Sequence, residues 1–237
     1  MTQLFYSSAT HIGNVRRVNE DSILSLPEQR IWLVSDGMGG HESGDFASQT
    51  VAATVASVAV GLAPAEAMHA LRDALLASHD TIRAETERRN GAIIGATVVA
   101  LLVANNHFVA FWVGDSRLYR FRDGGIELLT SDHSLAGDLV RAGAMSWRDA
   151  EGHPHANAIT RAVGVGEVLE LDKIRGDIRR GDRFLLCSDG LTKYADFDDL
   201  RAIVTGTPLE ILCARLIQTA LDGGGADNIS VVVVDAA

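Results

Sequence analysis

Four aspartates stand next to short apolar segments, and each lies close to a glycine. Asp36 follows IWLVS, Asp115 follows FWVG, Asp189 follows FLLCS, and Asp227 separates a glycine-rich turn from ISVVVV. If these segments are strands that share one end of a sheet, the four carboxylates come together and repel one another. Such a cluster raises its own pKa values unless a cation neutralises it. The pattern therefore predicts a hard divalent cation with oxygen ligands, Mg²⁺ or Mn²⁺.

Each of these placements also has a simpler interpretation. A single Asp-Gly pair usually closes a turn after a strand, and only the fourfold recurrence favours a metal site. Gly37, next to Asp36, could let its own backbone carbonyl approach an ion, or it could only form a turn. The segment GNVRRVNED adds Arg16, which suits bidentate phosphate binding, and the acids Glu20 and Asp21, which could hold metal-bound waters. On its own, this segment would be a solvated charged turn.

The elements that must position these residues begin with short strands rich in Val, Ile, Phe, Trp and Leu. Strands are predicted at residues 31–34, 96–103, 108–113, 117–121, 184–186 and 229–234. The turn sequences Asn105-Asn106 and Asp123-Gly124 indicate that neighbouring strands form antiparallel hairpins.

Helices are predicted in separate blocks, at residues 45–60, from Pro64 onward and up to about Leu221. The last of them is expected to start with Thr207 as N-cap, Pro at the first helical position and a capping-box Glu210. Separate blocks of strands and helices predict an α+β layered fold. Residues 132–165 differ, because two short helical patterns, the second at 146–151, precede the polar sequence HPHAN. We interpret this segment as an insertion beside the site.

The composition is that of a globular protein with an acid excess. The 237 residues are 47% apolar, and 31 acidic against 21 basic residues give a net charge of −10 at pH 7. We expect one domain over residues 1–237. The acid excess disfavours nucleic acid and anionic membrane surfaces as partners.

The chain is expected to be cytoplasmic. Neither of its uncharged runs, residues 46–65 and 92–113, is apolar enough to span a membrane, and the stretch before Arg16 has no secretory-signal pattern. Cys187 and Cys213 have no metal-type spacing, so we expect two reduced thiols packed in the interior.

Together, the segments resemble the bacterial type 2C protein serine/threonine phosphatases, the Mg/Mn-dependent PPM family. Matching segments lie in the family's order along almost the whole chain, and the most specific are DGMGGH (36–41), SDGLT (188–192) and GADNIS (225–230). The resemblance implies a central sandwich of two mainly antiparallel β-sheets flanked by helix pairs, in four layers αββα. It also implies a binuclear metal site at one end of the sandwich and makes residues 132–165 the family's flap.

The resemblance assigns roles to individual residues. It implies that Asp36 bridges two metal ions, that Gly37 binds through its backbone carbonyl, and that Asp189 and Asp227 complete the coordination of the first ion. Glu20 and Asp21 are implied to act through metal-bound waters. Asp115, with Asp189, is implied to bind a weaker third ion. Arg16 is implied to clamp the phosphate. His41 is a candidate proton donor, or else a turn histidine packed beside the site. The family's flap often has a basic residue after His-Pro, where this chain has His155.

The implied activity is hydrolysis of phosphoserine and phosphothreonine in proteins by in-line attack of a metal-bridging hydroxide, without a phosphoenzyme. Cys187 is expected to pack within its strand, and Ser116 and Ser188 have no visible base. Expected partners are phosphoproteins, with a cognate Ser/Thr kinase or a forkhead-associated protein of type VI secretion as candidates, and the chain is expected to be a monomer. The alternatives are a non-catalytic phosphoprotein binder, a phosphohydrolase of small molecules and a plain interaction domain.

Overall fold

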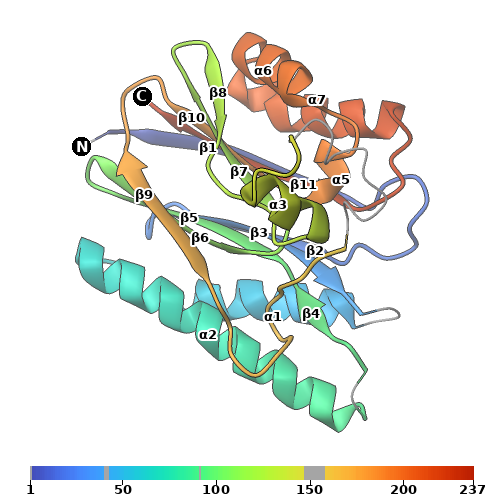
Figure 1. The fold of residues 1–237 in the computed structure, drawn as a ribbon. Coiled ribbons are helices and arrows are strands. Elements are labelled where there is room, and N and C mark those ends of the chain that lie inside the picture. Colours follow the sequence, from blue (N-terminus) through green and yellow to red (C-terminus); the bar gives the residue numbers. More distant parts are fainter. Residues whose placement is uncertain (1, 40–42, 91, 147–157) are drawn as a thin grey trace.

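The computed structural model describes residues 2–39, 43–90, 92–146 and 158–237. Its centre is a pair of antiparallel sheets (Figure 1). The first sheet has the order β1 (Leu4–His11), β11 (Ile229–Ala236), β10 (Arg183–Cys187), β7 (Arg117–Arg122) and β8 (Gly125–Leu128). The second has the order β2 (Asp21–Leu26), β3 (Ile31–Met38), β5 (Val98–Ala104), β6 (His107–Val113) and β9 (Asp172–Asp177), and the short β4 (Gly95–Ala96) pairs with β3.

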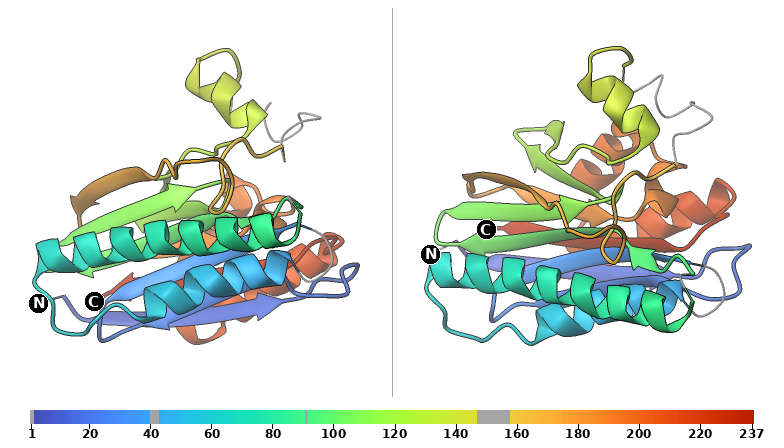
Figure 2. Two further views of the ribbon diagram at one scale, coloured as in Figure 1. Left: turned by 90° about the horizontal axis from the view of Figure 1, so that it is seen from below. Right: turned by 60° about the horizontal axis from the view of Figure 1, so that its bottom comes forward.

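Helices cover the outer face of each sheet. The second sheet is covered by α1 (Gly44–Ala56) and α2 (Pro64–Arg88), and the first by α5 (Asp189–Thr192), α6 (Phe197–Gly206) and α7 (Leu209–Asp222). The short helix α3 (Leu135–Arg141) projects from the sandwich, as both views of Figure 2 show. The expected α+β sandwich with flanking helices is confirmed.

The alternation of side chains along β11 explains why this strand is apolar throughout. Val232 and Val234 pack with Phe184 between the two sheets. Val231 and Val233 point the other way and pack with Leu216 of α7. Because both faces of the strand are covered, its sequence is a continuous apolar run rather than an alternating one.

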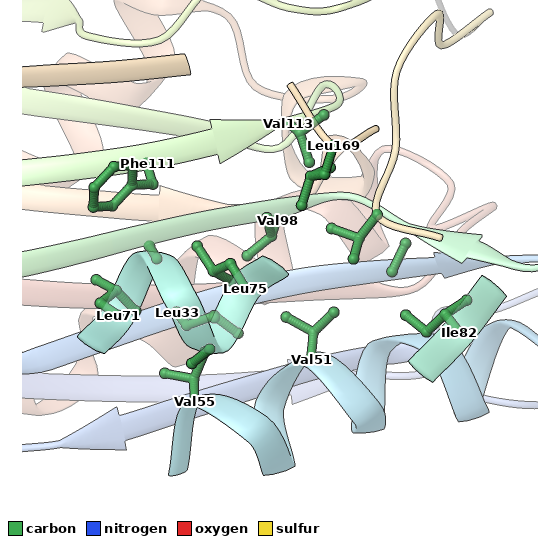
Figure 3. Packing of buried hydrophobic residues seen from close by; sticks show 14 of the residues in the cluster. Leu33, Val51, Val55, Leu71, Leu75, Ile82, Val98, Phe111, Val113 and Leu169 are labelled. Atoms are coloured by element: carbon green, nitrogen blue, oxygen red, sulfur yellow. The ribbon is translucent and has the colours of Figure 1, made fainter. Parts of the chain in front are cut away.

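A third apolar cluster joins the second sheet to its helices (Figure 3). Val51 and Val55 of α1 meet Leu71 and Leu75 of α2 above Leu33 of β3, and all five side chains are fully buried. The three clusters hold the strands, and therefore the strand ends, in fixed positions.

The predicted strands and the helices at 45–60 and after Pro64 are confirmed, with a break at Thr97 that divides the 96–103 strand. The strands β1, β2, β8 and β9 were missed, because they lie at sheet edges, where most side chains are exposed or partly buried and no continuous apolar run marks the strand. The predicted cap of the last helix is wrong. The helix begins at Leu209 with Pro208 as N-cap, and the hydroxyl of Thr207 accepts a hydrogen bond from Arg215 instead.

The flap region is described in part. The first helical pattern is confirmed as α3, whereas the second, at residues 146–151, and His155 lie outside the described residues except for Ser146. Cys187 and Cys213 are buried free thiols, as predicted. Within the described part of the chain, no helix combines the length and apolar character that crossing a membrane requires. One domain over residues 1–237 stays a prediction.

Replacement of Gly190 by alanine should destabilise the protein, because a Cβ there would lie 1.9 Å from the carbonyl oxygen of Asn228. Gly206 is the matched control, since a Cβ at this exposed helical position would meet nothing within 4 Å. We expect Gly190→Ala to lower the free energy of unfolding by about 1–3 kcal/mol, and Gly206→Ala to leave it unchanged or raise it. Chemical denaturation followed by circular dichroism measures both, and equal values would contradict the close approach.

Candidate active site

Antiparallel pairing brings the predicted acids to one end of the sandwich. The strand β10 ends just before Asp189, and its partner β11 begins just after Asp227, so both acids lie at the same end. The strand β7 begins just after Asp115 and pairs antiparallel with β10. In the second sheet, Asp21 at the start of β2 lies directly opposite Asp36 near the end of β3. Figure 1 shows that this end, marked by α5, lies away from both termini.

A cavity of about 360 Å³ opens at this end of the sandwich. It is lined by Arg16, Glu20, Asp36, Gly37, Met38, Gly39, Thr97, Asp115, Ile159, Asp189, Lys193, Asp227 and Asn228. Every predicted site residue except Asp21 and His41 therefore lines one space. Residue 41 lies outside the described residues, and its predicted role stays a prediction.

Asp21 is a buried carboxyl group held by hydroxyls. Its side chain accepts a hydrogen bond of 2.9 Å from the hydroxyl of Ser188. Burial raises the pKa of Asp21 to about 6, although hydrogen bonds from Ser230 and Ser188 oppose the shift. Repulsion from Asp189 and Asp227 adds to the increase. Repulsion of this kind between neighbouring carboxylates is what the sequence pattern predicted for a cluster of acids.

Asp36 lies among four other carboxylates that add to the effect of burial on its pKa. It is partly buried and lines the cavity, and its backbone N–H donates a hydrogen bond of 3.1 Å to the hydroxyl of Thr97. Its pKa is raised well above the ordinary value, first by burial and then by repulsion from other carboxylates. The repelling groups are Asp21, Asp189, Asp115 and Asp227.

Two cations face the remaining pair of acids. Arg16 pairs with Asp227 through its Nε at 2.8 Å and its Nη2 at 3.1 Å. The Nζ of Lys193 lies 2.8 Å from Asp189 and 2.9 Å from Asp227. Burial opposes ionisation of Asp227, but the contacts with Lys193 and Arg16 prevail and lower its pKa. Burial raises the pKa of Asp189, with Lys193 acting in the opposite direction.

Asn228 ties the loop that carries Arg16 to the start of β11. Its Nδ2 donates to the carbonyl oxygens of Ile12 at 2.9 Å and Val18 at 3.0 Å. Its Oδ1 accepts from the backbone N–H of Glu20 at 2.8 Å. These three hydrogen bonds position Arg16 beside Asp227, although more than 200 residues separate them in the chain.

Asp115 lies beside a buried network that reaches the flap region. Burial and then repulsion from neighbouring acids raise its pKa well above the ordinary value. The next residue, Ser116, has its hydroxyl 2.7 Å from that of Thr97. Arg117 then forms a buried ion pair with Asp132, with contacts of 2.8 Å and 3.0 Å. Since residue 132 begins the flap region, this pair anchors it at the site.

Gly37 lies where two chain segments approach closely. A Cβ at this position would lie 1.9 Å from the carbonyl oxygen of Gly44 and 2.7 Å from that of Glu20. The N–H of Gly37 donates to the same Glu20 carbonyl at 3.1 Å. Packing alone therefore requires glycine here, and the ligand role of its carbonyl stays a prediction.

Sequence reasoning missed Lys193 and Asn228 as site residues. Lys193 follows Asp189 by four residues, a spacing that places two side chains on one side of a helical turn. That spacing was a usable signal. Asn228 gave no such signal, because its partners lie at the other end of the chain.

The donor set fits divalent cations. The acids supply oxygen atoms only, and Asp21 Oδ1 and Asp189 Oδ1 are buried without a hydrogen-bond partner. Among the described residues, no group of three or more acidic, histidine or cysteine side chains is already arranged to hold a metal ion. Lys193 and Arg16 supply the positive charge among the acids instead. The chemistry of the site therefore suits Mg²⁺ or Mn²⁺, in an arrangement neutralised by its own cations.

A second cavity, of about 680 Å³, lies between the β7–β8 turn and the end of α6. Two of its three arginines are paired, Arg122 with Asp182 and Arg183 with Asp235. No carboxylate oxygen among its described lining residues is buried without a partner, as Asp189 Oδ1 is in the smaller cavity, and we assign the chemistry to the smaller one.

Comparison with known proteins agrees with the site. Residues 9–225 match the family described as protein phosphatase 2C. The chain therefore belongs to the protein phosphatase 2C family, as its motifs predicted. It is 35% identical to the serine/threonine protein phosphatase PstP of Mycobacterium tuberculosis over 98% of the chain. That match spans 45% of PstP, about half the length of this relative.

Solved structures agree over the whole fold. PppA, described as a key regulatory component of T6SS in Pseudomonas aeruginosa, is 38% identical, with a TM-score of 0.92 over 99% of this chain and 98% of that one. The catalytic domain of PstP in complex with two manganese ions is 34% identical, with a TM-score of 0.85 over 99% of both chains. PstP is named as a serine/threonine protein phosphatase, and the structure of its catalytic domain holds two manganese ions, the metal predicted for this chain.

The variant Asp36→Asn should stabilise the protein when divalent ions are removed. At a pH above its raised pKa, the ionised carboxylate of Asp36 is repelled by four others, and the amide is not. Because the folded-state pKa is raised, this destabilisation disappears as falling pH protonates the wild-type group. We expect the melting temperature to increase by about 2–5 °C at about pH 8 and the difference to narrow toward about pH 5.

Thermal melts by circular dichroism in EDTA measure this difference. Asp123→Asn, in the exposed turn after β7, is the control that removes the same charge elsewhere. A melting temperature of Asp36→Asn no higher than that of the control variant would contradict the repulsion.

Proposed function

We propose that this chain hydrolyses phosphoserine and phosphothreonine in proteins with the help of divalent metal ions. The supporting observation is the group of carboxylates at one end of the sandwich, held beside Arg16 around a single cavity. Membership in the protein phosphatase 2C family and the two manganese ions of the PstP catalytic domain support the same proposal.

Asp36, Asp189, Asp227 and the carbonyl of Gly37 would hold two Mg²⁺ or Mn²⁺ ions, with Glu20 and Asp21 acting through waters and Asp115 at a third ion. When bound, the ions would lower the pKa of a water and offset the negative charge of the phosphate. Asp21 and Asp115 would keep their charge beside the ions, because a cation opposes the repulsion that raises their pKa values. His41 would supply the proton that the leaving oxygen needs.

Arg16 would bind the phosphate group. Its side chain is 50% exposed and lines the cavity, so a phosphorylated segment can reach it. A guanidinium has five N–H donors in a planar fork, which suits two phosphate oxygens at once. Loop 12–20, fixed by Asn228, holds this group at the side of the site.

The chain's own nucleophiles are poorly placed for a covalent step. Ser188 is fully buried, and its hydroxyl donates to Asp21. Cys187 is also fully buried, and burial raises the pKa of its thiol to about 12, so it is protonated at neutral pH. These observations support direct attack by water on phosphorus, without a phosphoenzyme.

The partners follow from the proposed reaction. We infer that the substrates are phosphorylated proteins, produced by a Ser/Thr kinase that this enzyme opposes. The similarity to PppA, described as a regulatory component of T6SS, supports a role in type VI secretion. For such a role we propose a forkhead-associated protein as one candidate substrate. We further propose that the chain acts as a monomeric single domain in the cytoplasm, with the 132–165 flap choosing among substrates.

Removal of divalent ions should abolish the hydrolysis of a phosphothreonine peptide. We expect phosphate release to fall by at least about a hundredfold in EDTA and to return with excess Mn²⁺ or Mg²⁺. Asp189→Asn should stay inactive in Mn²⁺, whereas the control Asp123→Asn should recover. Activity that persists in EDTA would refute the metal-dependent mechanism.

Replacement of Arg16 by alanine should weaken the use of phosphopeptides. Loss of a charged hydrogen bond to phosphate should lower kcat/KM by about 10–100-fold. Arg17→Ala is the matched control, because Arg17 is an exposed neighbour that does not line the cavity. Steady-state kinetics with one peptide compares the two, and equal losses would refute a specific phosphate contact.

A further inference from the structure

Lys193 bridges two acids that the proposed function assigns to a metal ion. Its Nζ lies 2.8 Å from Asp189 Oδ2 and 2.9 Å from Asp227 Oδ2. All three side chains are mostly buried, with exposed fractions of 24%, 16% and 21%. The chain has only two lysines among its 21 basic residues, and the other is Lys173 on β9.

The position of Lys193 is held from both sides. Its backbone N–H donates to the carbonyl oxygen of Asp189 at 2.9 Å, so one helical turn carries both residues. The hydroxyl of the next residue, Tyr194, accepts a hydrogen bond of 3.0 Å from the N–H of Ala226, the residue before Asp227. Local structure therefore fixes the backbone from which the Lys193 side chain reaches the two carboxylates.

An ammonium and a divalent ion compete for the same oxygen atoms. A protonated lysine has three donors and no acceptor, so it cannot be a ligand to a metal. The two oxygen atoms that Lys193 contacts, Asp189 Oδ2 and Asp227 Oδ2, belong to carboxylates that the proposed site would offer to a metal ion.

We propose that Lys193 is a built-in counter-ion, which neutralises Asp189 and Asp227 in the metal-free protein and must leave them when a divalent ion binds. This inference rests on the proposed metal site. It makes Lys193 a positioning residue that stabilises the metal-free fold and weakens the affinity of the site for metal, because the ion bound by Asp189 and Asp227 displaces both ion pairs of Lys193.

The test is direct Mn²⁺ binding, with MnCl₂ titrated into metal-free protein by isothermal titration calorimetry. The variants are Lys193→Met and, as the matched control, Lys173→Met, which removes the same charge from an exposed strand position. We expect Lys193→Met to lower the dissociation constant of the tightest site by about tenfold. Lys173→Met should leave it within about twofold of wild type.

Thermal melts add a second readout. In EDTA, Lys193→Met should melt several degrees below wild type, because Asp189 and Asp227 then lose the cation that bridges them and only Arg16 still pairs with Asp227. In saturating Mn²⁺ this deficit should vanish. Lys193→Gln, which keeps a polar side chain of similar length, provides the same comparison if the Met variant does not fold.

The outcomes separate this inference from the proposed function. Wild-type binding of Mn²⁺ with an equal or weaker affinity in both Lys193 variants would overturn the counter-ion and leave the metal site intact. Failure of every protein to bind Mn²⁺ would overturn the metal site and the counter-ion together. Binding by the Lys193 variants that is tighter than wild type supports both.

Discussion

Mutual repulsion among buried carboxylates is the constraint on which the rest of the site depends. Asp21, Asp36, Asp115 and Asp189 all have raised pKa values, and burial is the largest cause in each case. Keeping such groups together is unfavourable unless other interactions fix the chain. Here the three apolar clusters do so, because they hold the strands whose ends carry the acids. The packing of the sandwich thus offsets the unfavourable burial and repulsion of the acids at its end.

Charge balance determines what the site can bind. Arg16 and Lys193 both contact Asp227, which is the acid of this group whose pKa is lowered. The negative charge of the chain as a whole, −10 at pH 7, argues against nucleic acid. It does not argue against phosphate, because divalent ions and Arg16 would offset the negative charge of the acids at this one end of the molecule.

The site is assembled from segments that are far apart in the sequence but share hydrogen bonds. Asn228 fixes the loop that carries Arg16, and Ser188 fixes Asp21. The buried pair Arg117–Asp132 anchors the start of the flap region beside Asp115. Substitution of any of these supporting residues would therefore affect the proposed reaction indirectly, because these residues position Arg16 and the acids of the site.

Local pattern in the sequence was sufficient for the strand-end acids and for the fold class. Asp36, Asp189 and Asp227 were recognisable because each adjoins an apolar run, and burial of both faces makes such runs continuous. Edge strands such as β9 were not recognisable, since solvent on one face removes that signal. Only the tertiary structure decided that Arg16 and Lys193 pair with Asp227 and that the pKa of Asp21 is raised. Ion pairs and desolvation depend on distances across the folded chain, and residue order alone does not contain them.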